Sequence, residues 1–246
     1  MGMTHIHLIG IGTGNPDHLT RQAEHAILAA DLILLPEKGD NKADLADIRR
    51  QIIDRIRPDA PIAPFTMPVR DESLPYALRV DAWHDSIARL WAEAIAVHGA
   101  PENVALLVWG DPSLYDSTLR IAARLEPVPQ ISVVPGITSL QALTAAHAIP
   151  LNTINGPVTI TTGRQLRDHG WPDRAESVYV KQDGVCSYQT VSKPNLHIWW
   201  GAYLGMPEQV LASGPVESVG ETIIAKRAAA RQRHGWIMDT YLLRRL

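Results

Sequence analysis

Three segments of the 246-residue chain are predominantly apolar and run directly into a glycine-containing turn. They are HIHLIGI at residues 5–11, NVALLVWGD at 103–111 and ISVVPG at 131–136. Strands that are apolar on both faces are typical of parallel sheets, because helices cover both sides of such a sheet. These segments therefore predict a parallel sheet in the first half of the chain.

The segments between these strands have the spacing expected of covering helices. Residues 20–30 predict a helix with Thr20 as its N-cap, and residues 30–36 predict a further strand. Apolar residues recur at three- and four-residue steps through residues 73–98, which predicts one long helix. Residues 60–69 contain three prolines, which favours a short edge strand or an irregular loop. The alternation of strand and helix favours an α/β fold.

The second half of the chain has shorter strands that mix polar and apolar residues, followed by a helix near residues 221–231. Asparagine, glycine and proline cluster at residues 152–157, as they do in connecting loops. We therefore expect two α/β domains, residues 1–152 and 153–246, with a cleft between them. The segments VTITTG, SVYVKQDG and LHIWWGAY are the strands expected in the second domain.

Composition limits the possible partners and location. The formal net charge is -3, which gives no general attraction for nucleic acid. The single cysteine, Cys186, excludes an internal disulfide and a multi-cysteine metal site. His5 and His7 share one strand face, but nothing in the sequence supplies a third ligand, so we expect no metal. We see neither a signal peptide nor an apolar run of the roughly 20 residues that span a membrane, and we expect a cytoplasmic protein.

The loop after the first strand carries Gly10, Gly12 and Gly14, followed by Pro16. A dinucleotide-binding loop needs the spacing G-x-G-x-x-G, whereas this loop reads G-x-G-x-G. Pro16 also removes an N–H donor where a phosphate would bind. Glu37 lies where a ribose-binding acid would be expected, so an NAD-binding oxidoreductase stays an alternative. A tight turn that contacts no ligand is another.

Two later segments have features of a ligand site. VWGDPSLYDS at residues 108–117 follows a buried strand, and open α/β sheets bind ligands at the carboxyl ends of their strands. VVPGITSLQALTAAHAIPLN at residues 133–152 places Thr138 and Ser139 at the start of a helix, where their hydroxyls could cap the helix or bind a ligand. Each segment taken alone is better explained by a structural role than by ligand binding.

In this order, the three segments resemble the tetrapyrrole (corrin and uroporphyrinogen) methylase family. That family carries G-x-G-x-G-x-P, then G-D-P-x-x-F/Y, then V-P-G-[IV]-[TS]-[SA] before I-P-L, and this chain has each motif in turn. The resemblance covers the whole chain. GDPSLYDSTLRI and GWIMDTYLLRR are most similar to a subfamily of cobalamin biosynthesis that methylates a precorrin at C-1 and releases an acetyl group as acetate.

The resemblance implies two α/β domains with the active site in the cleft between them, and a homodimer. It implies S-adenosylmethionine as methyl donor, S-adenosylhomocysteine as product and a precorrin as substrate. Neither nucleic acid nor a membrane is an implied partner. The implied cofactor contacts are Pro16, Trp109, Gly110, Asp111, Leu114, Tyr115, Thr138, Ser139, Gln182, Tyr203, Leu204 and Met238.

Two of these positions depart from the family pattern. Trp109 replaces a common glycine, and Gln182 stands where a methionine is frequent. The donor carries a sulfonium and no phosphate, so the glycine loop needs no phosphate-binding donors. Methyl transfer requires mainly that nucleophile and methyl group are held in line, so no covalent catalytic residue or metal is expected.

Loss of an acetyl group requires addition of water, and a general base would assist this step. Tyr115, Asp116 and Asp71 are the candidates for that catalytic role. Arginine suits the carboxylates of a tetrapyrrole, so Arg70, Arg79, Arg164, Arg167 and Lys181 could face the substrate. The basic residues between 226 and 233 are more simply an exposed helix face.

Other functions stay open at this point. Within the family, the chain could act on a different precorrin, on uroporphyrinogen or on ribosomal RNA, although the net charge of -3 counts against RNA. Outside it, an NAD-binding oxidoreductase or a non-catalytic binding module would share the α/β fold.

Overall fold

The structure is a computed structural model that describes residues 4–37, 43–191 and 194–246. The chain forms two compact units, Met1–Thr138 and Ser139–Leu246. This division falls before the boundary expected after residue 152, because the helix that begins at Ser139 packs on the second sheet.

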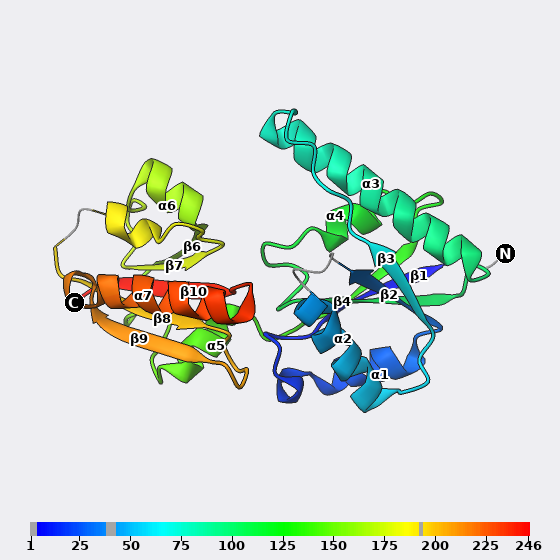
Figure 1. Ribbon diagram of the computed structural model, residues 1–246, viewed down its shortest axis with the longest axis horizontal. Helices are drawn as coiled ribbons and strands as arrows, with labels where there is room; N and C mark the ends of the chain where they lie inside the picture. Colours follow the sequence, from blue (N-terminus) through cyan, green and yellow to red (C-terminus); the bar gives the residue numbers. More distant parts are fainter. Residues whose placement is uncertain (1–3, 38–42, 192–193) are drawn as a thin grey trace. The chain divides into compact units, whose positions relative to one another are not determined.

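The first unit contains a five-stranded sheet in the order β3-β2-β4-β1-β5, and all of its strand pairs are parallel. Figure 1 shows α3 on one side of this sheet and α1 and α2 on the other. The elements are β1 His5–Gly10, η1 Pro16–His18, α1 Arg21–Ala29, β2 Leu32–Glu37, α2 Ala43–Ile56, β3 Ile62–Thr66, α3 Tyr76–Val97, β4 Asn103–Val108, α4 Thr118–Ala122 and β5 Gln130–Val134.

Alternating residues of each central strand enter two separate hydrophobic cores. Leu32 and Leu34 of β2 pack with α3 and α4, whereas Ile33 and Leu35 pack with α1 and α2. All four side chains are buried, at 1% exposure or less. The predicted parallel sheet with two covered faces is therefore confirmed.

Local signals account for several element boundaries. Thr20 is the N-cap of α1, and its side chain accepts a hydrogen bond from the Ala23 N–H at 3.1 Å. The proline-rich segment forms the edge strand β3, as one of the two predictions had it. Helix α2 was not predicted, although Ile48, Ile52 and Ile56 recur at helical spacing along it.

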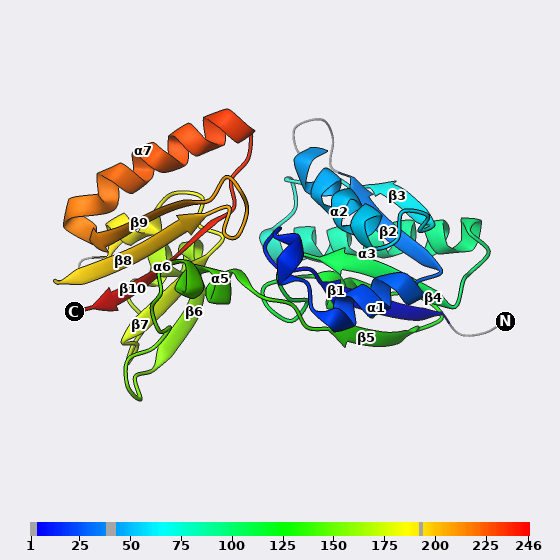
Figure 2. The ribbon, with the colours of Figure 1, turned by 90° about the horizontal axis from the view of Figure 1, so that it is seen from below.

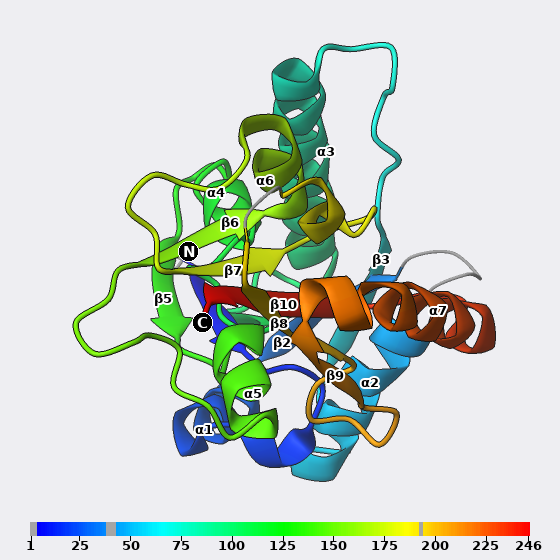
Figure 3. The same ribbon diagram turned by 90° about the vertical axis from the view of Figure 1, so that its left-hand side faces the viewer.

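The second unit contains a mixed sheet in the order β6-β7-β10-β8-β9, in which only β6 and β7 run parallel. Figure 3 shows this order, and Figure 2 shows α7 and α5 on opposite sides of the sheet. The elements are α5 Ser139–Ala146, β6 Val158–Thr162, α6 Gly163–His169, β7 Ser177–Lys181, η3 Ser187–Thr190, β8 Leu196–Ala202, β9 Val210–Pro215, α7 Val216–His234 and β10 Asp239–Arg245.

Helix α5 covers one face of this sheet through Leu140 and Leu143, which pack against Tyr179, Leu204 and Leu242. Among the described residues, no helix combines the length and the apolar character needed to cross a membrane.

Candidate active site

The carboxyl-terminal edge of the first sheet brings the three glycine-containing segments together. Strands β4, β1 and β5 are neighbours, and one of these segments follows each of them. Beyond the strand ends, Gly12 and Gly110 form an isolated antiparallel bridge. The Gly110 N–H donates to the Gly12 carbonyl at 2.7 Å, and the reverse hydrogen bond measures 3.3 Å.

Backbone packing explains two of the glycines. A Cβ atom on Gly136 would lie 2.1 Å from the Gly110 carbonyl oxygen, and one on Gly10 would lie 2.6 Å from the Gly136 nitrogen. Both distances are far shorter than van der Waals contact. Gly10 and Gly136 are therefore required by the approach of three chain segments to one another, whether or not a ligand contacts the loop.

The Asp111 side chain connects the segment that follows β4 to the segment that follows β5 by a hydrogen bond. Its Oδ2 accepts a hydrogen bond from the Gly136 N–H at 2.9 Å. Its Oδ1 accepts from the Ser113 N–H at 2.8 Å and from the Ser113 hydroxyl. The Leu114 N–H donates to the Asp111 carbonyl at 3.2 Å, which closes the turn. The Asp111 side chain thus fixes the geometry of this edge.

Two other predicted contacts belong to the first unit. Pro16 opens the short helix η1, where the Asn15 side chain accepts a hydrogen bond from the Asp17 N–H. Thr138 is buried at 8% exposure and lies near Gly110, since a Cβ on that glycine would be 3.8 Å from the Thr138 Cα. Both residues therefore belong to segments at the edge that carries Gly12 and Gly110.

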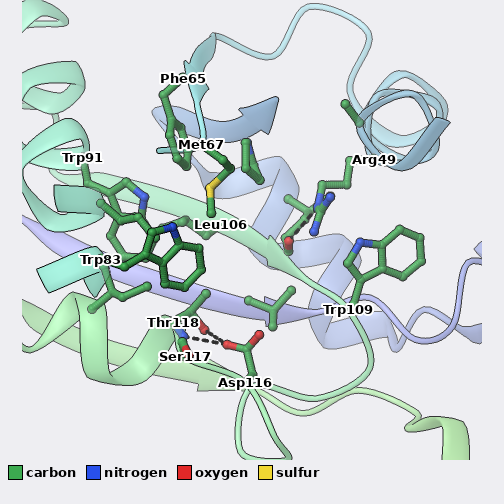
Figure 4. Close-up of a pocket in the computed structure, with 16 residues that line it drawn as sticks. Arg49, Phe65, Met67, Trp83, Trp91, Leu106, Trp109, Asp116, Ser117 and Thr118 are labelled. Carbon is green, nitrogen blue, oxygen red and sulfur yellow. Dashed lines mark hydrogen bonds between the residues drawn. The ribbon is translucent and has the colours of Figure 1, made fainter. Parts of the chain in front are cut away.

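A cavity of about 220 Å³ lies within the first unit near the carboxyl-terminal ends of β2, β3 and β4, and residues of both α3 and α2 line it. Figure 4 shows its lining. The apolar wall includes Phe65, Met67, Trp83, Trp91 and Leu106, and the polar part includes Arg49, Trp109, Asp116 and Thr118. The cavity joins residues of α2, β3 and α3 to the segment that follows β4.

Arg49 of α2 supplies positive charge to this cavity. Its Nε donates to the Leu107 carbonyl at 3.0 Å, and its Cζ lies 5.2 Å from the centre of the Trp109 ring. Burial lowers the pKa of the Arg49 guanidinium to about 10, and the carboxylate of Asp116 opposes this shift. The group therefore stays charged at neutral pH in surroundings that solvate it poorly.

Two indole nitrogens at the cavity are buried and have no hydrogen-bond partner among the described residues. They are Nε1 of Trp91, a residue with 2% exposure, and Nε1 of Trp109. By contrast, Nε1 of Trp83 donates to the Pro68 carbonyl at 2.8 Å. A buried donor that forms no hydrogen bond costs about 1–3 kcal/mol, so these two N–H groups favour an acceptor within the cavity.

The three candidates for the catalytic base lie in different environments. Asp116 lines the cavity, and its Oδ1 accepts hydrogen bonds from the Thr118 N–H and hydroxyl at 2.6 and 2.5 Å. Tyr115 does not line it and is 42% exposed. Asp71 lies on an exposed loop, where its Oδ1 accepts from Ser73 and these bonds lower the pKa of the carboxyl. Only Asp116 is placed beside the cavity.

In the second unit, strand register gathers three predicted contacts at one sheet edge. Asp239, the first residue of β10, pairs with Ala202 at the end of β8, and Tyr241 pairs with Val180 of β7. Gln182 and Tyr203 follow the ends of β7 and β8, and Met238 precedes β10. The Tyr203 N–H donates to the Met238 carbonyl at 3.0 Å.

The other two predicted contacts of this unit pack into its core. Leu204 is buried at 4% exposure among the residues that α5 covers. Ser139 begins α5, and its hydroxyl accepts a hydrogen bond from the Tyr179 hydroxyl at 2.8 Å. The Ser139 hydroxyl thus already has a structural partner.

Three predicted contacts adopt the left-handed backbone conformation that side chains disfavour. Tyr115, Gln182 and Tyr203 have φ angles of 52°, 53° and 50°. Such conformations cost on the order of 1 kcal/mol and recur at ligand-binding positions. They also occur elsewhere in this chain, for example at Ala100, so they support a binding role without deciding it.

The basic residues differ in their contacts. Arg70 stacks on Trp83, with 4.2 Å between its Cζ and the ring centre, and Arg167 pairs with Asp168 at 2.8 Å. The expectation that residues 226–233 form a simply exposed basic face is wrong for Arg227. Its side chain is 13% exposed and forms an ion pair with Asp239 at 2.9 Å.

Comparison with known proteins identifies the family. Residues 5–220 match the family model of Tetrapyrrole (Corrin/Porphyrin) Methylases. The chain belongs to this family. Among curated tetrapyrrole methylases, "Precorrin-6A synthase [deacetylating]" of Sinorhizobium sp is 45% identical over 99% of this chain and 96% of its own length. The alternative of an NAD-binding oxidoreductase loses its support.

Solved structures agree with this assignment. A protein of Corynebacterium diphtheriae, described as cobalamin synthesis related (CobF), is 41% identical and covers 100% of both chains with a TM-score of 0.85. Uroporphyrin-III C-methyl transferase of Thermus thermophilus, solved in complex with S-adenyl homocysteine, is 18% identical and has a TM-score of 0.59. It covers 97% of this chain and 91% of its own, and it shows the tetrapyrrole methylase fold.

The sequence analysis named Trp109 and Asp116 but missed the other residues that form the polar and aromatic lining of the cavity in this methylase. Arg49 was overlooked together with α2, although the helical spacing of isoleucines along that segment was available as a signal. Trp83 and Trp91 are among the apolar residues whose spacing predicted the helix at residues 73–98, and both pack in the first core. Nothing in their spacing indicated that both rings border a cavity, because that depends on how α3 lies against the sheet.

Proposed function

We propose that this tetrapyrrole methylase is a precorrin-6A synthase (deacetylating), which methylates precorrin-5 at C-1 and releases acetate. The observation that carries this proposal is the full-length similarity to the Sinorhizobium enzyme of that name. The sequence-based choice of subfamily, which rested on GDPSLYDSTLRI and GWIMDTYLLRR, agrees with that relative.

S-adenosylmethionine is the proposed methyl donor, and it would supply a methyl group already activated by a positive sulfonium. In the first unit, the segments around Gly110 and Thr138 would contribute mainly backbone groups to its binding. In the second unit, Gln182, Tyr203 and Met238 would contribute from their shared sheet edge. The left-handed conformations of Gln182 and Tyr203 fit such a role, because they direct backbone groups away from the regular sheet.

The chain's own contribution to methyl transfer is positioning. The contacts among Gly10, Gly110, Gly136 and Asp111 hold three segments in one arrangement before any ligand arrives. A preorganised edge of this kind removes the cost of ordering loops around the reactants.

Asp116 is the proposed general base for removal of the acetyl group. The hydrogen bonds from Thr118 orient its carboxylate at the cavity. We expect Asp116→Asn to lower the rate of acetate release by about 100-fold, because the amide keeps the shape and the bonds from Thr118 but accepts no proton. The measurement is acetate released from precorrin-5 in single turnover.

The control is Asp59→Asn, which changes an exposed carboxylate beside Arg57 and should leave the rate unaltered. An unchanged rate in Asp116→Asn would exclude Asp116 as the base. Asp71→Asn and Tyr115→Phe test the other two candidates. Loss of acetate release in either variant would identify that residue as the general base.

The function itself is tested by incubating the protein with methyl-labelled S-adenosylmethionine and precorrin-5. We expect one acetate and one methylated product per turnover, and no turnover with uroporphyrinogen III or precorrin-2. Methylation of one of those two instead, without acetate, would favour the alternative of a tetrapyrrole methylase with another substrate. A homodimer and a cytoplasmic location are proposed along with this function.

A further inference from the structure

The size of the cavity limits what it can hold. Drug-sized ligands occupy pockets of roughly 300–1,000 Å³, whereas this cavity measures about 220 Å³. A complete tetrapyrrole is larger than a typical drug, so the macrocycle cannot enter. A single side group with few atoms can.

The lining specifies the chemistry of that group. Phe65, Met67 and Leu106 form an apolar wall suited to a methyl group. The indole N–H groups of Trp91 and Trp109 are donors buried at the cavity, and neither has a partner in the part of the chain that the structure describes. Buried donors in native proteins are nearly always paired. A group with a methyl end and an acceptor oxygen would satisfy both parts of the lining.

The charge of the lining favours an anionic oxygen over a neutral one. The Arg49 guanidinium lies against Trp109, and Figure 4 shows these two side chains facing each other. Asp116 carries the opposing negative charge, and two hydrogen bonds from Thr118 engage one of its oxygens. A short carboxylate therefore fits within the cavity and suits both its apolar and its charged lining.

We propose that this cavity is the subsite for the acyl group that the reaction removes, and that it binds acetyl in the substrate and acetate in the product. This inference rests on the proposed deacetylating function. Arg49 and the Trp109 indole receive the acyl oxygen, and the apolar lining receives the methyl group. Asp116 lies beside the same space, where it can take a proton from the attacking water.

The step balances as a hydrolysis. The water oxygen bonds to the acyl carbon, and Asp116 accepts the water proton. The carbon–carbon bond to the ring then breaks, and its electron pair stays with the ring. The acetic acid formed in this way gives up its remaining proton to solvent and leaves as acetate, with its negative oxygen beside Arg49, whose charge stabilises both the developing and the final anion. The electron pair left on the ring carbon is the nucleophile that accepts the methyl group.

Titration of the protein with carbon-13-labelled acetate, followed by NMR, tests the subsite without any tetrapyrrole. We expect saturable binding, weakened about tenfold or more by Arg49→Met and about fivefold by Trp109→Phe. Arg50→Met is the matched control, since Arg50 is the next residue of α2, pairs with Glu37 and does not line the cavity. It should change binding by less than about twofold.

A second control, Trp171→Phe, removes an indole that donates to the Ala175 carbonyl and does not line the cavity. Melting curves show whether each variant is folded, and Arg49→Met gives an independent result if Trp109→Phe is not folded. Absence of saturable acetate binding, or equal binding in Arg49→Met and Arg50→Met, would overturn the proposal.

Turnover of precorrin-5 distinguishes the acyl group from another carboxylate arm of the substrate. If the cavity holds the acyl group, Arg49→Met lowers kcat for acetate release and leaves KM nearly unchanged. A raised KM with unchanged kcat would mean that a side-arm carboxylate occupies the cavity, and would overturn the acyl assignment. Failure of the wild type to release acetate from precorrin-5 would instead refute the proposed function. The acetate titration contains no tetrapyrrole, so it tests the subsite independently of that function.

Discussion

Gly136→Ala is expected to destabilise the protein by about 3 kcal/mol or more. The added Cβ would lie 2.1 Å from the Gly110 carbonyl oxygen and 2.8 Å from two Gly10 backbone atoms. Backbone atoms of two neighbouring segments cannot move aside as a flexible side chain can, so the contact must be relieved by displacing the segments. The melting temperature should fall by roughly 6–12 °C.

Two further glycines provide a graded control for this prediction. Gly184→Ala should be nearly neutral, because nothing lies within 4 Å of a Cβ there. Gly110→Ala should cost about 1–2 kcal/mol, because its φ of 65° is left-handed although its nearest neighbour lies 3.8 Å away. If Gly136→Ala has the same melting temperature as Gly184→Ala, the backbone contact does not constrain position 136.

The glycines show which features of the site can be predicted from the sequence and which cannot. The spacing of the first loop and Pro16 argued against a dinucleotide-binding loop, and the chain belongs to the tetrapyrrole methylases. The reason for glycine at positions 10 and 136 could not be read from the sequence, because it lies in contacts among segments about 25 to 126 residues apart. Those contacts follow from the strand order β4-β1-β5, which no local pattern specifies.

The two sheets also differ in how well the sequence predicted them. In the first, Leu32 to Leu35 are buried on both faces, so the apolar pattern predicted a parallel sheet. In the second, β10 runs antiparallel between β7 and β8, and neither β9 nor β10 was predicted as a strand. That arrangement nevertheless places Gln182, Tyr203 and Met238 at one edge of the sheet, and their role as cofactor contacts stays a prediction.

The cavity is the part of the site that sequence reasoning could not reach. Arg49, Trp91 and Asp116 lie on α2, α3 and the segment after β4, and only tertiary packing brings them to one space. Motif spacing found Asp116 because it follows the GDP segment. It could not find Arg49 or Trp91, which lie outside every motif.

Arg227→Met is expected to lower the stability of the second unit by about 3–5 kcal/mol at pH 8. Arg227 and Asp239 form an ion pair at 2.9 Å with side chains 13% and 9% exposed, and Trp200 also donates to the same Asp239 oxygen at 3.0 Å. Removing the guanidinium leaves a carboxylate buried without its cation. Chemical denaturation measures the change, and Arg55→Met, which breaks an exposed pair with Asp17, should cost under about 1 kcal/mol.

The destabilisation should depend on pH with a definite sign. Burial already raises the pKa of Asp239, and Arg227 partly offsets this, so Arg227→Met raises the pKa further. An acid whose pKa is raised by folding favours the folded state when protonated and opposes it when ionised. The stability difference between wild type and Arg227→Met should therefore shrink as the pH falls from 8 toward 5.

The double variant Arg227→Met/Asp239→Asn separates charge from packing. With both charges gone, the amide oxygen can still accept from Trp200, so stability at pH 8 should recover by about 2 kcal/mol relative to Arg227→Met. Its stability should also lose the pH dependence that distinguishes the single variant from wild type. A double variant as unstable as Arg227→Met, with the same response to pH, would mean that the aliphatic packing of Arg227 and not its charge supports this unit.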